Sequence, residues 1–296
     1  MEIKINNLSK IYPGGHEALI DINLTLREGM FGLLGPNGAG KSTLMRILVT
    51  IMQPSSGEVL INGKEISTQR KEVRQMLGYL PQDFRFFAKL RSWEFLDYAA
   101  RLAGMTSKRE RSERIDEMLQ DVGLYKFRNR MANKLSGGMK RRLGIAQALI
   151  ANPSIIIVDE PTTGLDPEER IRFRNLLSDL SHTDTIIILS THIVSDISST
   201  CSQMALLNEG KLVYNGPPDQ LVSEAKGYVW QAKVSQEQYE NLKENVPIIS
   251  TIPSGTGWEI QFVGEKPKEM EAEEMHPNLE HAYVHYMENK LNHWSL

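Results

Sequence analysis

The sequence predicts an α/β protein with a parallel β-sheet at its centre and a small α+β domain at its C-terminal end. Two apolar runs, Ile155–Val158 and Ile186–Leu189, have the length of strands buried on both faces, and a segment with helical spacing separates them. Because parallel strands require a crossover connection, this strand–helix–strand order favours a parallel sheet covered by helices. A turn-forming segment, Asn215–Pro218, then breaks the chain before the small domain.

The N-terminal segment predicts an antiparallel β subdomain. Apolar and polar residues alternate at Ile3–Ile5 and Ile22–Leu26, which is typical of half-buried strands. Val59–Ile61 followed by an Asn-Gly pair predicts a hairpin. The apolar strand Phe31–Leu34 leads through a Gly-rich turn into a predicted helix over Ser42–Ile51.

Helical spacing dominates over about residues 90–150, where Ser92 is a candidate N-cap, so we expect a helical subdomain there. The chain break near residue 217 suggests one domain over 1–217 and a small C-terminal domain over 218–296. In the small domain, the pattern predicts strands, one polar helix and a last amphipathic helix at Asn278–Asn289.

The composition favours a cytosolic protein without a membrane-spanning segment. The net charge of −3 predicts no broad attraction to nucleic acid or to an acidic membrane surface. A single cysteine, Cys201, cannot form a disulfide within the chain and suits a reducing compartment. No stretch approaches the roughly 20 apolar residues that a bilayer-spanning helix needs. Any membrane role would therefore depend on a partner.

Residues 35–43 (GPNGAGKST) match the phosphate-binding pattern G-x-x-x-x-G-K-[ST] in full. Glycines let backbone N–H groups converge on phosphate oxygens, and the helix that follows adds its positive end. We expect Lys41 to contact the β- and γ-phosphates of a bound nucleotide and Ser42 to bind Mg²⁺. The other expected nucleotide contacts in this loop are Asn37, Gly38, Ala39, Gly40 and Thr43.

Two carboxylates follow the buried strand Ile155–Val158. Asp159 stands where it can hold Mg²⁺ through water, and Glu160 is placed to polarise an attacking water as a general base. Alone, this pattern fits any strand that leaves a core. Together with the phosphate-binding loop, it predicts a functional site.

The order of these motifs resembles the ATP-binding-cassette (ABC) superfamily over roughly residues 1–217. The segment LSGGM at 135–139 resembles the family's LSGGQ signature, with Met where Gln is usual. In the family, backbone amides at the positions of Ser136, Gly137 and Gly138 grip the γ-phosphate of the nucleotide held by the other subunit, which suits a helix N-terminus. The alternative is a Ser-Gly-Gly N-cap without a ligand. The resemblance implies a P-loop nucleotide-binding cassette with an antiparallel β subdomain and a helical subdomain.

Four further residues match positions that the family uses. Gln82 resembles the loop glutamine that senses Mg²⁺ and the membrane partner, and Asp166 resembles part of the loop through which subunits communicate. His192 resembles the switch histidine at the γ-phosphate. Tyr12 stands where the family stacks an aromatic side chain on adenine. Without the resemblance, these would be read as ordinary loop, core or structural residues.

The resemblance implies the ATP-hydrolysing subunit of an ABC transporter, with ATP and Mg²⁺ as cofactors. It implies that two copies, expected as a homodimer, sandwich ATP and drive a separate integral membrane permease. The protein would then be cytoplasmic and peripheral on the inner face of the cell membrane. The tail from Tyr228 to Tyr283 resembles that of drug and antibiotic exporters, which favours export. The expected catalytic residues are Glu160, His192 and Lys41, and the expected Mg²⁺ contacts are Ser42, Gln82 and Asp159.

Two other functions fit parts of the pattern. One is a soluble ABC-type ATPase that acts on ribosomes or DNA, but the ribosomal kind usually carries two phosphate-binding loops, and the DNA-repair kind splits its cassette around a long coiled coil. The short stretch between Lys41 and Leu135 leaves no room for such an insertion. The other is a nucleotide-sensing scaffold without turnover, which would need neither Glu160 nor His192.

The loop after Gln82 (DFRFF, residues 83–87) places three phenylalanines within five residues. We expect it to dock the membrane partner, since exposed phenylalanines on a free monomer would favour aggregation. The alternative is that these rings pack inward against Trp93 and Phe95.

Overall fold

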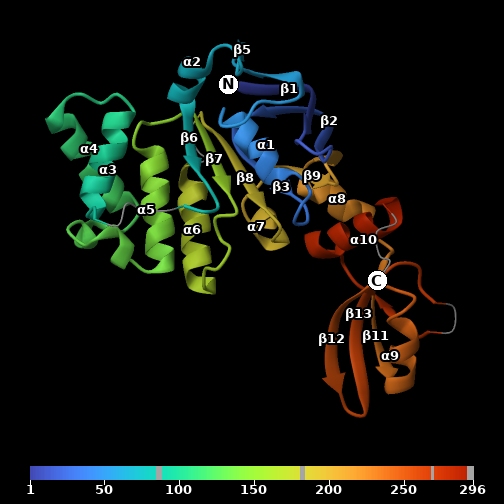
Figure 1. Cartoon of the computed structure of the whole chain (residues 1–296). Coiled ribbons are helices and arrows are strands. Elements are labelled where there is room, and N and C mark those ends of the chain that lie inside the picture. Colours follow the sequence, from blue (N-terminus) through green and yellow to red (C-terminus); the bar gives the residue numbers. More distant parts are fainter. Residues whose placement is uncertain (85–88, 181–183, 268–269, 292–296) are drawn as a thin grey trace. The chain divides into compact units, whose positions relative to one another are not determined.

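The computed structural model describes residues 1–84, 89–180, 184–267 and 270–291 (Figure 1). The chain divides into two compact units, one over Met1–Asn215 and one that begins at Gly216. Within the described ranges, no helix combines the length and the apolar character that crossing a bilayer requires.

The first unit begins with a four-stranded sheet in the order β2-β1-β4-β5. Its strands are β1 (Glu2–Ile11), β2 (Glu17–Arg27), β4 (Ser56–Ile61) and β5 (Lys64–Glu65). β1 pairs antiparallel with β2 and β4. Much of β1 and β2 alternates between buried and exposed residues. The predicted antiparallel β subdomain is confirmed.

A six-stranded sheet in the order β10-β9-β3-β8-β7-β6 forms the centre of this unit. Its strands are β3 (Gly29–Leu34), β6 (Leu77–Leu80), β7 (Ile155–Asp159), β8 (Ile186–Thr191), β9 (Gln203–Asn208) and β10 (Lys211–Gly216). β3 runs parallel to β8 and β9, and β7 runs parallel to β6 and β8. All residues of β7 and β8 are buried, as expected for a covered parallel sheet. Because β3, β7 and β8 are parallel, the loops that follow them emerge at the same edge of the sheet.

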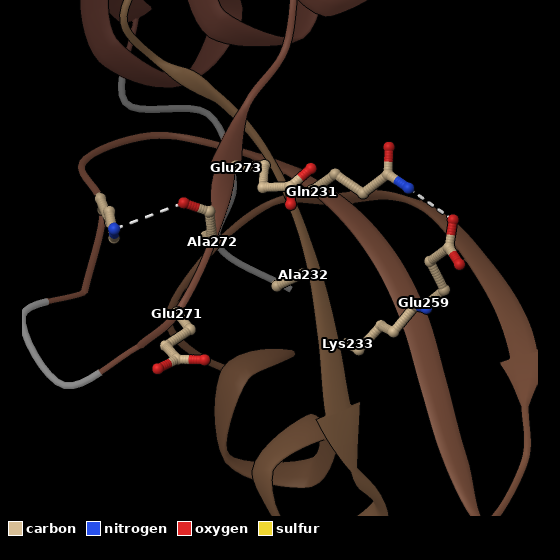
Figure 2. A pocket seen from close by; sticks show the side chains of 8 residues that line it. Gln231, Ala232, Lys233, Glu259, Glu271, Ala272 and Glu273 are labelled. Carbon is tan, nitrogen blue, oxygen red and sulfur yellow. Dashed lines mark hydrogen bonds between the residues drawn. The ribbon is translucent and has the colours of Figure 1, made fainter.

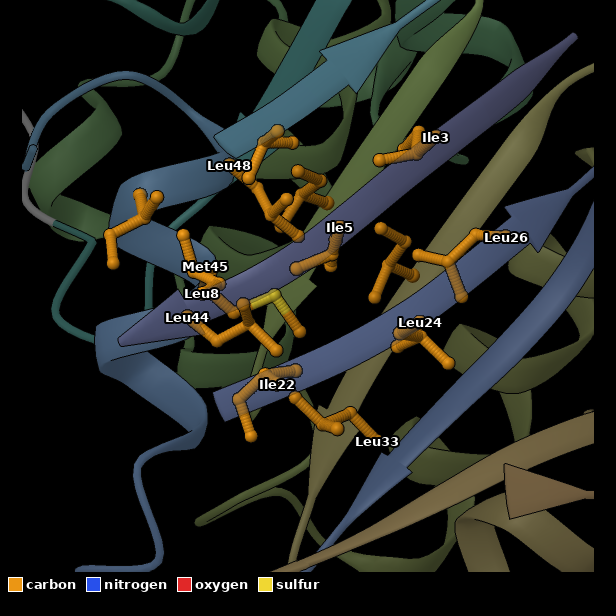
Figure 3. Packing of buried hydrophobic residues seen from close by; sticks show 14 of the residues in the cluster. Ile3, Ile5, Leu8, Ile22, Leu24, Leu26, Leu33, Leu44, Met45 and Leu48 are labelled. Carbon is orange, nitrogen blue, oxygen red and sulfur yellow. The ribbon is translucent and has the colours of Figure 1, made fainter. Parts of the chain in front are cut away.

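Helix α1 (Lys41–Leu48) packs into the core that joins the two sheets. Its Leu44 and Met45 belong to one apolar cluster with Ile5 of β1 and Ile157 of β7, and Figure 3 shows the two helical side chains beside the β1 and β2 residues. Fully burying one such side chain stabilises the fold by about 1.5–3 kcal/mol. The cluster therefore fixes where the N-terminus of α1 lies relative to the strand ends.

The predicted helical subdomain consists of α3 (Ser92–Leu102), α4 (Lys108–Asp121) and α5 (Gly137–Leu149). The prediction of Ser92 as N-cap is wrong by one residue, because α3 begins at Ser92 and Arg91 precedes it. The Arg91 N–H donates to the Glu94 carboxylate at 2.7 Å. Ser92 is fully buried, and its hydroxyl donates to the Arg130 carbonyl at 3.2 Å instead. The remaining helices of the first unit are α2 (Arg70–Met76), α6 (Pro167–Leu180) and α7 (Val194–Ser198), with short 3₁₀ turns at Tyr125–Phe127 and Ala132–Lys134.

The second unit is a small α+β structure, as the sequence predicts. Its antiparallel sheet has the order β12-β13-β11-β14. Its elements are α8 (Pro218–Glu224), β11 (Val229–Ser235), α9 (Gln236–Leu242), β12 (Ile248–Ser254), β13 (Gly257–Val263), β14 (Glu273–Glu274) and α10 (Leu279–Leu291). A polar pocket of about 600 Å³ lies beside β11 (Figure 2). There, the Gln231 side chain donates to the Glu259 carboxylate.

Candidate functional site

The phosphate-binding loop connects β3 to α1 and ends in a glycine with an unusual backbone. Gly40 precedes the helix with φ +104°, a region that L side chains rarely adopt. A Cβ at this position would also lie 2.4 Å from the Ala18 carbonyl oxygen. Both the backbone angle and the close approach therefore require glycine here. The result is a helix N-terminus with free backbone N–H groups, which is suited to an anion.

Lys41 lies buried within this loop, with 5% of its surface exposed. Its ammonium donates to the carbonyl oxygens of Gly35 at 2.7 Å and Pro36 at 3.1 Å. It also pairs with the Glu160 carboxylate at 3.5 Å. Burial lowers the pKa of Lys41, and the Glu160 carboxylate opposes that change. The ammonium is thus held at the loop by acceptors that a phosphate group can complement or replace.

Asp159 ends β7 directly beside the start of α1. Its Oδ1 lies 3.4 Å from the Ser42 hydroxyl and also accepts a hydrogen bond from the Ser190 hydroxyl of β8. The structure therefore brings Ser42 and Asp159, both predicted as Mg²⁺ contacts, to one point. The Asp159 charge also acts on Tyr79, whose pKa is raised to about 12, mainly by burial and further by the Asp159 carboxylate.

Glu160 follows Asp159 with φ +47°, which is uncommon for a residue other than glycine. Its N–H donates to the Ser190 carbonyl at 3.0 Å, which holds this backbone against β8. Its carboxylate, only 5% exposed, accepts from the Thr163 hydroxyl at 3.1 Å and lies 2.8 Å from His192 Nδ1. Strained backbone that is held by surrounding bonds is often found at active sites. The side chain is thereby directed between Lys41 and His192.

Asp196 links the loops that follow β7 and β8, and the sequence analysis did not single it out. It is fully buried, and its Oδ2 accepts from the hydroxyls of Thr162 and Thr191. Thr162 lies two residues after Glu160, and Thr191 directly precedes His192. The Asp196 carboxylate thus ties together the segments that carry the two predicted catalytic residues.

A cavity of about 280 Å³ lies over the phosphate-binding loop. The loop residues Asn37–Thr43 line it together with Gln82 and Glu160. Gln82 is exposed, and its carbonyl accepts from Arg141 of α5 at 2.8 Å. The full set of residues that line the cavity is Tyr12, His16, Ala18, Asn37, Gly38, Ala39, Gly40, Lys41, Ser42, Thr43, Gln82 and Glu160.

Two rings stand at one side of this cavity, where the sequence analysis named only Tyr12. The Tyr12 and His16 rings are stacked, with centroids 6.2 Å apart and planes 18° apart. The Tyr12 hydroxyl shares a hydrogen bond of 3.2 Å with the Thr43 hydroxyl. Because His16 follows two glycines in an exposed turn, spacing alone gave no signal for it.

The signature residues form the start of α5, away from this cavity. Ser136 is exposed, and its hydroxyl accepts from the Met139 N–H at 3.2 Å, so it is the N-cap of the helix. Among the described residues that line the cavity over the phosphate-binding loop, none comes from Ser136–Gly138. Asp166 is also exposed, and its Oδ1 accepts from the Glu169 N–H at 2.9 Å at the start of α6. Within one chain, Ser136, Gly138 and Asp166 are therefore not gathered with the other predicted ATP contacts, whereas Gly137 lines a separate pocket together with Gln82.

Phe84 lies half-buried rather than free in the loop after Gln82. Its ring packs edge-on against Phe95 of α3, with centroids 5.8 Å apart. Phe86 and Phe87, on which the docking prediction also depends, lie outside the described residues.

A family model described as "ABC transporter" matches residues 19–163. An ABC transporter ATP-binding protein of Bacillus subtilis, YxlF, described as uncharacterized, is 35% identical over 84% of this chain and 82% of its own length. The methionine import ATP-binding protein MetN 2 of Bacillus cereus is 33% identical over 89% of this chain and 80% of its own length. The bacitracin transport ATP-binding protein BcrA of Bacillus licheniformis is 36% identical over 77% of this chain and 73% of its own length.

Among solved structures, the ATP-binding cassette MJ0796 is similar in fold. It was solved as a dimer in a post-hydrolysis state with ADP and Pi, and it matches with a TM-score of 0.67 and 29% identity over 73% of this chain and 98% of its own. The fold, the phosphate-binding loop and the relatives agree on one assignment. This chain belongs to the ATP-binding subunits of ABC transporters, the family whose activity is ATP hydrolysis.

Proposed function

We propose that this chain powers a separate membrane permease by ATP-driven dimerisation, and that it does so as an exporter. The observation that carries the catalytic part is that Lys41 and His192 both contact Glu160, which lines the cavity over the phosphate-binding loop. Glu160 contacts the other two, at 3.5 Å and 2.8 Å. A buried carboxylate between a cation and an imidazole is placed to accept a proton from an attacking water.

The roles of the other residues follow from their positions. The N–H groups of Asn37–Thr43 cradle the phosphates, and Lys41 supplies a positive charge to the β- and γ-phosphates. Tyr12 stacks on the nucleobase. His192 orients Glu160 through Nδ1 and leaves its other ring nitrogen for the γ-phosphate.

Mg²⁺ fits the oxygen atoms that the chain offers here. The Ser42 hydroxyl lies 3.4 Å from Asp159 Oδ1, and Gln82 lines the same cavity as Ser42. Hard oxygen ligands of this kind, completed by phosphate and water, suit Mg²⁺. When bound, the ion would neutralise charge on the β- and γ-phosphate oxygens.

Dimerisation would complete the site. Ser136, Gly137, Gly138 and Asp166 are exposed or lie at exposed helix starts, away from the cavity of their own chain. A second copy could bring its signature to the nucleotide, and the dimeric cassette MJ0796 supports this arrangement by similarity. We infer a homodimer that closes when ATP fills both sites and opens after hydrolysis.

The permease would dock beside the loop that follows Gln82. Arg141 of α5 donates to the carbonyls of Pro81 and Gln82, which directly precede that loop. A partner at this point would therefore contact the segment next to the Mg²⁺ site and, through α5, the signature. The protein would act at the inner face of the cell membrane. We assign residues 1–217 to the nucleotide-binding domain and 218–296 to an accessory domain with a regulatory role.

Purification of the tagged chain from detergent-solubilised membranes of its native host tests the partnership. We expect a polytopic membrane protein to co-purify and to stimulate ATPase activity. Enrichment of ribosomes or DNA-repair proteins instead would contradict it.

The direction of transport needs its own test, because the relatives include both a methionine import protein and a bacitracin transport protein. Inside-out vesicles that contain the complex should accumulate labelled bacitracin or other amphipathic drugs when ATP is added. ATP-dependent release from such vesicles, or uptake only in right-side-out vesicles, would identify an importer.

A further inference from the structure

Glu169 joins the two exposed helix starts of the first unit, α5 and α6. It is the third residue of α6, and its backbone N–H donates a hydrogen bond to Asp166 Oδ1 at 2.9 Å. Its carboxylate extends to α5, where it pairs with Arg142 Nε at 3.3 Å. The two side chains are largely buried, with 15% of Arg142 and 19% of Glu169 exposed.

The Glu169 carboxylate also lies directly against Gly138. A Cβ on Gly138 would lie 2.4 Å from Glu169 Oε2 and 2.6 Å from its Cδ. The glycine therefore leaves the space that this carboxylate occupies, so a side chain at 138 would require Glu169 to shift. A carboxylate at this point also interacts favourably with the positive N-terminal end of α5.

Arg142 extends the connection to a third helix. Its Nη1 donates to the Val122 carbonyl at 3.0 Å, at the C-terminal end of α4. Without Glu169, a largely buried guanidinium would lose its carboxylate partner, and breaking one side of such a pair is costly. The first turn of α5 would then lose the contact that fixes it to α6.

We propose that Glu169 is a positioning residue that holds the signature, Ser136–Gly138, in a fixed relation to Asp166. The inference rests on the proposed function, in which both segments meet the nucleotide of the other subunit. The Glu169 carboxylate then joins the signature and the Asp166 segment into a single rigid surface. Neither segment must therefore be ordered separately when the dimer closes. Glu169 acts only on dimer closure and leaves ATP binding by its own chain unchanged.

The test uses the full chain in a Glu160→Gln background, where slow hydrolysis lets ATP-bound dimers accumulate. Glu169→Ala should weaken ATP-dependent dimerisation, measured by analytical ultracentrifugation, by about tenfold or more, the effect of losing one largely buried charged contact. Glu169→Gln keeps the side-chain shape against Gly138 but removes the charge. Its dimer affinity should lie between those of the Glu160→Gln reference and of Glu169→Ala. ATP affinity of the isolated subunit should stay within about twofold of the reference.

Glu168→Ala is the matched control, because Glu168 lies on the same helix, is 75% exposed and pairs with Arg172. Arg172 also lies 3.6 Å from Glu169 Oε1, so the control shows what loss of the shared Arg172 contact contributes. It should leave dimerisation unchanged. Unaltered dimerisation in Glu169→Ala, or a parallel fall in ATP affinity and melting temperature, would overturn the proposal.

Hydrogen exchange at the amides of residues 136–140 in the monomer separates this inference from the proposed function. Exchange there should be faster in Glu169→Ala than in Glu168→Ala. If the Glu160→Gln reference itself fails to dimerise with ATP, the dimerisation model is wrong. Unchanged exchange would refute the positioning role whether or not the dimer forms.

Discussion

His192 Nδ1 lies 2.8 Å from Oε2 of Glu160 and joins the loop after β8 to the loop after β7. Because an ionised carboxylate only accepts hydrogen bonds, the imidazole donates from Nδ1. His192 is 39% exposed, whereas Glu160 is 5% exposed. The histidine is therefore accessible from solvent, while the carboxylate is largely enclosed by protein.

We expect His192→Ala to keep ATP binding and to lower steady-state ATPase activity by about 10²–10³-fold, the usual effect of losing one charge-stabilising donor. His192→Asn is the informative companion, because its amide can still donate to Glu160 but cannot reach as far as the imidazole. It should recover part of the lost rate. Phosphate release and nucleotide binding, measured on both variants, check this. Equal rates for Asn and Ala would show that the Glu160 contact contributes nothing to turnover.

Ser136→Arg should block dimer closure while leaving ATP binding at the phosphate-binding loop of the same chain intact. The substitution puts a bulky cation where the γ-phosphate of the other subunit must approach backbone amides. Mixing it with Lys41→Ala subunits should restore one working site per mixed dimer, measured as recovered ATPase activity. Loss of ATP binding by the isolated Ser136→Arg subunit would show that the signature acts within its own chain.

The second unit should lose stability in mild acid through His281. The Asn278 N–H donates to His281 Nδ1 at 3.3 Å, and the His281 N–H donates to the Asn278 side chain at 2.9 Å, so the pair caps α10. Burial lowers the pKa of His281 from its usual 6.5, with Glu280 opposing the change. The unfolded chain then binds the proton more readily, so stability is present above about pH 6.5 and declines as pH falls below it.

His281→Gln should abolish this contribution, because glutamine at the same capping position keeps an acceptor and does not titrate. Hydrogen exchange over 279–291 at pH 7.5 and pH 5.5 measures it. The native chain should exchange faster at the lower pH once intrinsic rates are corrected, and the variant should not. The same acid response in both proteins would assign it to another group.

Local patterns predicted the covered parallel sheet and the half-buried N-terminal strands, and the cassette as a whole followed from the family resemblance. The apolar runs at β7 and β8, the alternation in β1 and β2 and the phosphate-binding motif each have a fixed spacing. Such patterns depend on burial and on ligand geometry, both of which act on neighbouring residues. They also placed Ser42 and Asp159 at the same sheet edge, where the structure brings them together.

The sequence did not predict contacts between side chains that are far apart along the chain and follow no regular spacing. Asp196 bonds to Thr162 across more than thirty positions, and His16 joins the cavity through an irregular turn. Glu169 sits in a charged stretch that looks like a solvated helix face, yet its carboxylate reaches Gly138. Each of these contacts depends on tertiary packing. The same holds for Ser92, whose hydroxyl donates to the Arg130 carbonyl instead of capping α3.

The most direct test of the central claim is the steady-state ATPase rate of Glu160→Gln, measured beside ATP affinity with the permease present. If Glu160 is the general base, ATP binding is retained and the rate falls by about 10²–10⁴-fold. The ATP-bound dimer should then persist. A near-normal rate in this variant, with ATP binding intact, would contradict the account.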